Sequence, residues 1–534
     1  MVDAAKTPAA GDSGRFRLMT VIVLIMAVAS LLIGEKVQAG AGLGWDGITY
    51  AKMVRGLDKQ IAGGELSTYY AQRSLTPAVI RAALLALGTP FTNANIIRAF
   101  ELWNALLAVG ATLLWQRIAI RLRFGAAACW IGFAALFMNF AFAKQNFFYP
   151  VLTDMTALFL SMTTMLCTLE RRRLALLATT VVAAFCWPTA ALSGALLLLF
   201  RSVRGEGLWH EPVEPGAAPR RRRGLLAAGV AVLALYLLAV ALTASGLLCP
   251  VLDRAMSIVV ASSPAAVKAK IAGANACSAF AGMLTAVPTF ALVGAAVLTL
   301  ALAGLNWRAL GTKAREMRPL DVLAAMLALL LPMIGTRLIA NPALPNVSSP
   351  FALLKAALLP PEAMVLMPLV SVGVFWGPAV VLMMLQWRRF AAAARALGPG
   401  WVALLSFNLP FAVVGEPRFV TLAWPFLVVA LVCAIDQQPV RRRFGWAFAA
   451  ASLFFAQFWL PLNYLRWDRQ DFQNLLVLPK QLYFMHYGLW MSWPAYVAQS
   501  LALLIVGIWL HGTWRREATG AKPGPGLRVE RAGR

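Results

Sequence analysis

Two aspartates in aromatic surroundings are the side chains of this sequence that are best suited to acid–base chemistry. Asp46 lies in the segment 44–50, just after the first long apolar run, and Asp154 ends the segment 147–154. A carboxylate at a membrane surface can act as a general base on a hydroxyl group. Both positions are also typical of helix caps, Asp46 for a short helix that begins near Ile48 and Asp154 for the apolar run that follows it. Each carboxylate therefore has a catalytic and a purely structural interpretation.

A late turn between two apolar runs holds a second group of charged side chains. It reads Glu416-Pro417-Arg418. Arg418 could bind a phosphate in bidentate geometry, or it could pair with Glu416 and simply fix the turn. The later polar segment 465–493 is rich in aromatic residues, which stack on sugar rings and also anchor proteins at membrane interfaces. His486 in this segment could carry a proton or be a satisfied polar group, and a lone histidine makes no metal site.

The elements that must position these side chains are helices in a lipid bilayer. Of the 534 residues, 60% are hydrophobic and 13% are charged, whereas soluble domains carry about 25% charged residues. The mean hydropathy is +0.71. Several apolar runs reach the ~20 residues that a helix needs to cross a bilayer, whereas a membrane barrel would show short alternating segments. We therefore expect an all-α, polytopic integral membrane protein.

The apolar runs predict about 14 transmembrane helices. The first, 18–33, follows a cytoplasmic tail, 1–17, and precedes a long polar loop, 34–94. In this loop we expect an interfacial helix at 77–87, with Arg81 reaching the lipid headgroups. The run 174–200 is broken at Trp187-Pro188-Thr189 and predicts two short helices. The other expected spans are 96–115, 126–142, 156–169, 224–248, 284–305, 320–340, 363–386, 401–414, 419–436, 445–464 and 494–510.

Clusters of positive charge predict how the chain is oriented in the membrane. The formal net charge is +26, and the lysines and arginines gather in short clusters between apolar runs. This pattern is typical of cytoplasmic loops, and it favours a membrane topology over nucleic-acid binding. We expect both termini in the cytoplasm and the polar segments with Asp46, Asp154 and Arg418 on the outer face. The expected outer loops are 34–94, 143–153, 249–283, 341–362, 415–418 and 465–493.

The six cysteines show neither a CxxC pair nor the Cys/His spacing of a metal site. Cys249 and Cys277 fall in the same expected outer loop, so in an oxidising periplasm they could form a disulfide, or they could be two buried thiols. The sequence also lacks the Walker A, GxGxxG, GxSxG and HExxH motifs. An enzyme of this kind would therefore take a lipid-borne donor at its outer face.

Two outer segments resemble acidic motifs of the GT-C superfamily of membrane glycosyltransferases. The residues Trp45-Asp46-Gly47, with Tyr50, resemble the acidic motif of the first loop, and the segment 149–154 is similar to the acidic motif of the second outer loop. The helical pair around 187–189 also matches, although many members carry a lysine near this turn and this chain does not.

The late turn extends the resemblance, because Glu416-Pro417-Arg418 followed by Pro425 resembles a motif of bacterial members. The segment 465–493 resembles bacterial cell-surface glycopolymer proteins. The resemblance implies a GT-C-like catalytic module over 18–248, further helices and periplasmic loops over 249–510, and a basic cytoplasmic tail over 511–534. It also implies the inner membrane of a bacterium, with the active site facing the periplasm.

The resemblance implies a reaction as well. A polyprenyl-phosphate sugar would enter from the bilayer, and Asp46 would deprotonate a hydroxyl of a glycan or lipid acceptor, which attacks the anomeric carbon with inversion. Cationic groups would stabilise the departing phosphate. The residues so implied are Asp46 and Asp154 as catalytic groups and Tyr50, Arg73, Glu416, Arg418, Lys480 and His486 as substrate-binding groups. Asp154 would orient the acceptor or help to hold a divalent cation, Mg²⁺ or Mn²⁺, and the need for a metal stays open.

A secondary transporter is the main alternative, because transporters combine ionisable residues with broken helices. The break at Pro188 keeps this alternative open. Transporters place such residues at the bilayer midplane, however, whereas Asp46 and Asp154 are expected at the outer ends of helices, and we see no inverted repeat. A flippase or polymer ligase for lipid-linked glycans would use similar outer arginines without needing Asp46 as a base. A non-catalytic scaffold is the remaining class.

Overall fold

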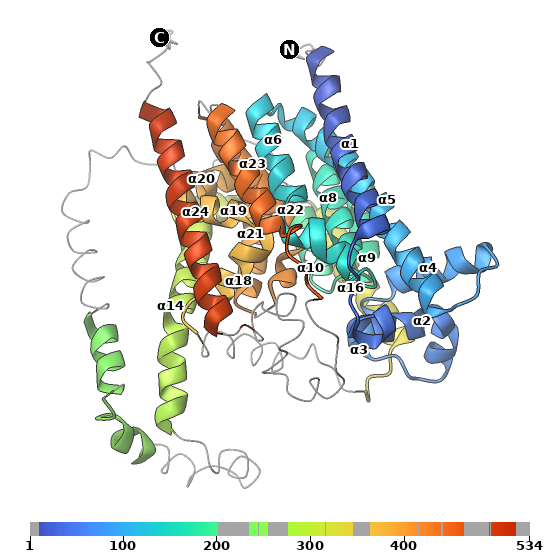
Figure 1. Ribbon diagram of the computed structural model, residues 1–534, viewed down its shortest axis with the longest axis horizontal. Coiled ribbons are helices and arrows are strands. Elements are labelled where there is room, and N and C mark those ends of the chain that lie inside the picture. The colour runs from blue at the N-terminus through green and yellow to red at the C-terminus, as the bar shows by residue number, and fades with distance from the viewer. Residues whose placement is uncertain are drawn as a thin grey trace.

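The computed structural model describes residues 10–200, 234–243, 245–254, 276–315, 317–344, 364–414, 416–438, 442–463, 491 and 493–519. Every regular element in these ranges is a helix, and no strand occurs in them (Figure 1). The all-α prediction is therefore confirmed for the described part of the chain.

Five helices are long and apolar enough to cross a membrane, or up to seven if each of two bent helix pairs counts as one span. The expected number of about 14 crossings is not confirmed, because the other apolar helices in the described ranges have only 10–17 residues. The five long helices are α1 (Ala10–Ile33), α5 (Asn93–Leu122), α14 (Ala276–Ala301), α16 (Pro319–Ile339) and α24 (Trp493–Thr519).

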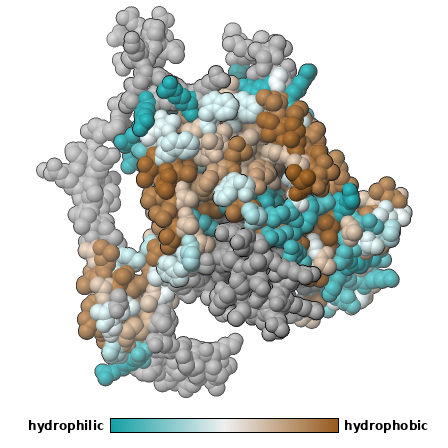
Figure 2. All heavy atoms as spheres, in the orientation of Figure 1, coloured by the Kyte–Doolittle hydropathy of each residue, from teal (hydrophilic) through white to brown (hydrophobic). Residues whose placement is uncertain are grey.

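The outer helices carry apolar side chains on surfaces that no other part of the described chain covers. On α24, Val497, Leu501, Leu504 and Ile508 are all about half exposed or more, at a spacing that places them on one helix face. Figure 2 shows such apolar surface along the long helices. An exposed apolar stripe of this size is typical of contact with lipid. The described helices are thus compatible with a multi-pass membrane protein.

The centre of the bundle is built from shorter helices. They are α6 (Ala126–Phe137), α8 (Asp154–Leu169), α9 (Arg173–Ala184), α10 (Ala190–Leu199), α20 (Trp387–Leu397), α21 (Pro399–Asn408), α22 (Trp424–Asp436) and α23 (Arg442–Ala456). In α22, 11 of the 13 residues are buried, so this helix is apolar all round and lies inside the core. The predicted break at Pro188 is confirmed, since α9 ends at Ala184 and α10 begins at Ala190.

The expected span 363–386 is wrong as a single helix. It consists of α18 (Met367–Trp376) and α19 (Pro378–Leu385), which are bent by 119° relative to each other. Gly377 at the bend has φ +77°, which side chains with a Cβ rarely adopt, and Pro378 then begins α19 without needing a hydrogen bond for its nitrogen. A second pair, α6 with η2 (Ala141–Gln145) and α7 (Asn146–Phe148), is bent by 49°.

The polar loop 34–94 is folded into helices. It contains η1 (Ala39–Gly42), α2 (Asp46–Ala62), α3 (Thr68–Ala71) and α4 (Leu75–Ala86). The interfacial helix expected at 77–87 is confirmed as a helix, but Arg81 does not reach outward. Its guanidinium donates to the carbonyls of Val54 and Arg55 and pairs with Asp58 at 2.8 Å, which ties α4 to α2.

The start of α1 and the end of α24 lie at the opposite end of the bundle from α2 and its Asp46 (Figure 1). In Figure 1, α1 begins and α24 ends at the same end, whereas α2 and α3 lie toward the other.

Cys249 and Cys277 form a disulfide with a Cα–Cα distance of 4.9 Å, so of the two interpretations of this pair the disulfide is confirmed.

Candidate functional site

Arg418 joins two carboxylates that lie far apart in the sequence. It is in η4 (Pro417–Val420), and its Nη2 lies 2.9 Å from Oδ2 of Asp46, while its Nε lies 2.6 Å from Oε2 of Glu416. The three side chains are 18%, 22% and 27% exposed for Arg418, Asp46 and Glu416, so the cluster is sheltered but can be reached. The predicted pairing of Glu416 with Arg418 is confirmed, and Asp46 completes it.

The guanidinium of Arg418 keeps its charge in this setting. Burial by itself would lower the pKa of Arg418, but the carboxylates of Glu416, Asp46 and Asp154 outweigh it, and the pKa lies well above its ordinary value. A permanently charged, planar group that faces two carboxylates can also exchange one of them for a phosphate, two of whose oxygens can accept from the same guanidinium.

The backbone around Asp46 packs closely against Tyr149. The hydroxyl of Tyr149 accepts a hydrogen bond from the backbone nitrogen of Gly47 at 3.1 Å. Gly44 has φ +75°, and a Cβ built there would lie 2.1 Å from the Tyr149 ring, so only glycine fits. At Gly47, a Cβ would lie 3.0–3.2 Å from Val151, which makes this approach tight as well.

Asp46 is not a helix cap. It is the first residue of α2, Trp45 occupies the N-cap position, and the N-cap residue makes no side-chain hydrogen bond to the helix. The structural interpretation of Asp46 is therefore wrong for this chain. Its ion-pair partner, Arg418, belongs to a segment 372 residues away.

Arg73 is buried between two aromatic rings. Only 2% of the residue is exposed, and the guanidinium carbon lies 4.3 Å from the centre of the Tyr69 ring and 4.9 Å from that of Trp187. Its Nε has no hydrogen-bond partner among the described residues. Because Trp187 lies in the break between α9 and α10, the broken helix brings an aromatic face to the only cation of the segment 66–80. This stacking is a cation–π arrangement.

Three tyrosines line the same region. Tyr50 is completely buried, its hydroxyl has no partner in the described chain, and its ring meets that of Tyr70 edge-on at 6.0 Å. Burial raises the pKa of Tyr69, and the carboxylates of Asp46 and Glu416 raise it further, while Arg73 and Arg418 oppose them. The charges of Asp46, Arg73, Glu416 and Arg418 thus all act on the Tyr69 hydroxyl.

Asp154 is the first residue of α8 and is 6% exposed, and neither of its carboxylate oxygens has a hydrogen-bond partner within the described ranges. The N-cap of α8 is Thr153, so the capping interpretation of Asp154 is also wrong. The side chain lines a cavity of about 10 Å³, large enough for one water molecule. Thr421 lines the same cavity and donates its hydroxyl to the carbonyl of Arg418, so the cavity adjoins the charged cluster.

The carboxylates of the described residues do not form a site for a resident divalent cation. Oxygens of Asp46 and Glu416 are engaged by Arg418, and Asp154 faces a separate small cavity. Within the described residues, no group of three or more His, Cys, Asp or Glu side chains could hold a metal ion.

Two expected substrate-binding residues, Lys480 and His486, lie outside the described residues. The sequence patterns assign no role to Tyr149 or Trp187, although both stand in segments that resemble GT-C motifs. The sequence feature that could have pointed to both residues is a large aromatic side chain directly before a proline, next to an apolar run.

Comparison of the chain with models of protein families, with curated proteins and with solved structures finds no match.

Proposed function

We propose that this protein is a membrane glycosyltransferase that transfers a sugar from a polyprenyl-phosphate donor to a glycan or lipid acceptor. The observation that supports this proposal best is the pairing of Asp46 with Arg418, which places a carboxylate base 2.9 Å from a phosphate-binding group. The sequence resemblance to the GT-C superfamily selected both residues independently of their contact.

In the proposed reaction, Asp46 takes the proton of an acceptor hydroxyl as the oxygen attacks the anomeric carbon from the face opposite the phosphate. The new carbon–oxygen bond forms while the bond from the anomeric carbon to the phosphate oxygen breaks, and its electron pair leaves with the phosphate. The configuration at the anomeric carbon is inverted. The polyprenyl phosphate is a stable anion and leaves without a strong general acid, so one base is enough.

Arg418 has the geometry to bind the departing phosphate. It presents two donors in one plane, and phosphate oxygens can replace the carboxylate oxygens that it now contacts. Arg73 holds a second buried positive charge, stacked on Tyr69 and Trp187, that stabilises anions at a distance. We assign to Asp154 the role of orienting the acceptor, because its carboxylate has no hydrogen-bond partner in the described chain. No step of the proposed reaction requires a metal ion.

The proposal includes a location in the cell. We place the protein in the inner membrane of a bacterium, with both termini in the cytoplasm and the Asp46–Arg418 cluster at the periplasmic face. The positive clusters between the apolar runs support this orientation. We keep about 14 crossings as the proposed topology, in which the bent pairs and the shorter apolar helices form further spans beside the five long helices.

The test uses the full chain in lipid nanodiscs with radiolabelled polyprenyl-phosphate sugars and a cell-envelope acceptor fraction. The wild-type protein, Asp46→Asn and a matched control, Asp58→Asn, are compared. Asp58 lies on the same helix but pairs with Arg81. We expect transfer by wild type and Asp58→Asn, and a loss of about 100- to 10,000-fold in Asp46→Asn, because general bases contribute this much. Full transfer by Asp46→Asn would refute its role as the base.

A transporter or flippase of envelope glycan precursors is the second candidate. The broken pair α9–α10 and the bent pair α18–α19 favour it, since discontinuous helices are typical of transport proteins. Movement of a lipid-linked glycan across a liposome membrane that persists in Asp46→Asn, with no sugar transfer by the wild type, would support this candidate instead.

A further inference from the structure

An apolar pocket of about 350 Å³ lies between α14 on one side and α18, α19, η3 (Leu409–Val413) and α22 on the other, and none of Asp46, Glu416 and Arg418 lines it. Its walls are aliphatic and aromatic apart from the hydroxyl of Thr299. Because Leu292 and Met384 in these walls are more than 40% exposed, the pocket communicates with the lipid-facing surface. A space of this kind, open to lipid and without charge, fits a hydrocarbon chain.

One end of the pocket is capped by the basic helix α20. The indole nitrogen of Trp387, a pocket residue, donates to the hydroxyl of Thr299 at 2.7 Å, and Nη1 of Arg395 donates to the Thr299 carbonyl at 3.0 Å. Arg388 and Arg389 follow directly and are exposed. The helix has three arginines and no acidic residue, and no ion pair to these arginines occurs among the described residues. A positive surface therefore stands at the rim of an apolar pocket.

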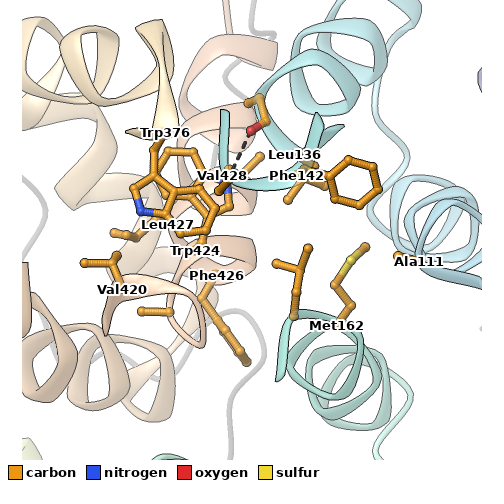
Figure 3. Packing of buried hydrophobic residues seen from close by; sticks show 14 of the residues in the cluster. Ala111, Leu136, Phe142, Met162, Trp376, Val420, Trp424, Phe426, Leu427 and Val428 are labelled. Carbon is orange, nitrogen blue, oxygen red and sulfur yellow. Dashed lines mark hydrogen bonds between the residues drawn. The ribbon is translucent and has the colours of Figure 1, made fainter. Parts of the chain in front are cut away.

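The other end of the pocket reaches the element that carries Arg418. Val420 and Trp424 line the pocket, and Val420 is in η4 with Arg418. Trp424 is stacked on Trp376 at 4.6 Å between ring centres, and Figure 3 shows the two indoles together with Val420 and Leu427 beside them. Trp376 in turn donates to the carbonyl of Pro417 at 2.9 Å. A chain that fills the pocket would thus support η4.

We propose that this pocket binds one acyl chain of an anionic phospholipid of the bilayer, whose phosphate is held by Arg388 and Arg389. The proposal goes beyond the proposed sugar transfer and does not rest on it. The charges at the two ends of the pocket indicate which end binds the headgroup. Arg418 already pairs with two carboxylates, whereas the arginines of α20 form no ion pair with another described residue. Basic residues beside an apolar groove attract anionic headgroups over zwitterionic ones.

The first experiment measures thermal unfolding of the full, delipidated chain in a mild detergent. Phosphatidylglycerol is added to one sample and phosphatidylcholine to another. We expect phosphatidylglycerol to raise the unfolding temperature by about 3 °C or more, since a ligand that binds only the folded state stabilises it, and phosphatidylcholine to have little effect. In Arg388→Gln/Arg389→Gln this difference should vanish, whereas in the control Arg121→Gln/Arg123→Gln it should persist. Equal effects of both lipids on the wild type would overturn the proposal.

A second variant tests the pocket separately from the charges. Ala296→Phe places a ring in the pocket, and the phosphatidylglycerol effect should fall although all arginines remain. A further sample receives polyprenyl phosphate in place of phosphatidylglycerol, because it is the other lipid phosphate that the pocket could bind. If polyprenyl phosphate stabilises the wild type and phosphatidylglycerol does not, the pocket belongs to the donor lipid and the proposal is wrong, whatever the transfer assay shows.

Discussion

At the scale of the residue, the two donors of Arg418 explain why this position needs arginine. Nη2 reaches Asp46 and Nε reaches Glu416, so a single planar group fixes both carboxylates. In Arg418→Lys the charge remains, but one ammonium cannot hold both partners in the same plane. We expect sugar transfer to fall about 100-fold, in line with the loss of one donor at a developing negative charge.

The matched control for this substitution is Arg117→Lys, which alters an arginine that is 59% exposed and pairs with Glu170 at 3.2 Å. We expect it to leave transfer unchanged, because exposed ion pairs contribute little. Initial transfer rates in nanodiscs are the measurement. Equal rates for the two variants would contradict a special role for the guanidinium geometry.

Gly44 provides a second test at the residue scale. A Cβ at this position meets the Tyr149 ring at 2.1 Å, and φ is +75°. Gly44→Ala should therefore displace Tyr149, remove the support of Gly47 and misplace Asp46. The backbone strain alone costs about 1–3 kcal/mol. We expect a lower unfolding temperature and at least a 10-fold loss of transfer.

Gly445→Ala is the control for Gly44→Ala, because nothing in the described chain lies within 4 Å of its added Cβ. It lies inside α23, where alanine is the better helix former, so its unfolding temperature should stay the same or rise slightly. An unchanged unfolding temperature in Gly44→Ala would show that the loop can move away from Tyr149.

At the scale of the element, Glu35 connects the end of α1 to two other segments. Its carboxylate accepts from the backbone nitrogens of Leu462 and Asn463 and pairs with Lys144 of η2 at 3.1 Å. Burial by itself would raise the pKa of Glu35, but the hydrogen bonds from Leu462, Lys144 and Asn463 outweigh it and lower the pKa below its ordinary value of 4.5. The charged form is thus favoured in the folded state.

This lowered pKa predicts how stability depends on pH. A depressed carboxyl pKa stabilises the folded state above the unfolded pKa, and the stabilisation is lost as the pH falls through the folded pKa. We expect the wild type to lose unfolding temperature below pH 4.5 more steeply than Glu35→Gln, while Glu35→Gln is less stable at neutral pH. Thermal unfolding from acidic to neutral pH measures this difference. Parallel pH curves for the two proteins would contradict the assignment.

Sequence patterns predicted the positions of the helices better than they predicted which residues contact one another. The apolar runs located α5, α8, α16 and α24 because a helix in lipid must be continuously apolar, and Pro188 located the break because proline cannot continue a helix. The bend at Gly377 was missed, since 363–386 is apolar throughout and a positive φ leaves no trace in hydropathy. The contact of Asp46 with Arg418 was also beyond a linear pattern, because it closes across 372 residues.

At the scale of the whole molecule, the disulfide gives the most direct test of the outer compartment. The chain has six cysteines, of which Cys249 and Cys277 are bonded and four are free. In protein taken from membranes and unfolded in detergent, a maleimide should add four labels without a reductant and six after reduction. Cys249→Ser should accept five labels in both conditions, because Cys277 loses its partner. Six labels on unreduced wild type would contradict an oxidising location.

The resting ion pair between Asp46 and Arg418 has a kinetic consequence. While Oδ2 of Asp46 accepts the hydrogen bond of Arg418, that oxygen is not available to an acceptor alcohol or a water molecule that arrives first. Only an anion that occupies Arg418 releases the carboxylate. Under the proposed reaction the two substrates therefore bind in a compulsory order, donor before acceptor, and the acceptor alone neither competes with the donor nor traps the enzyme.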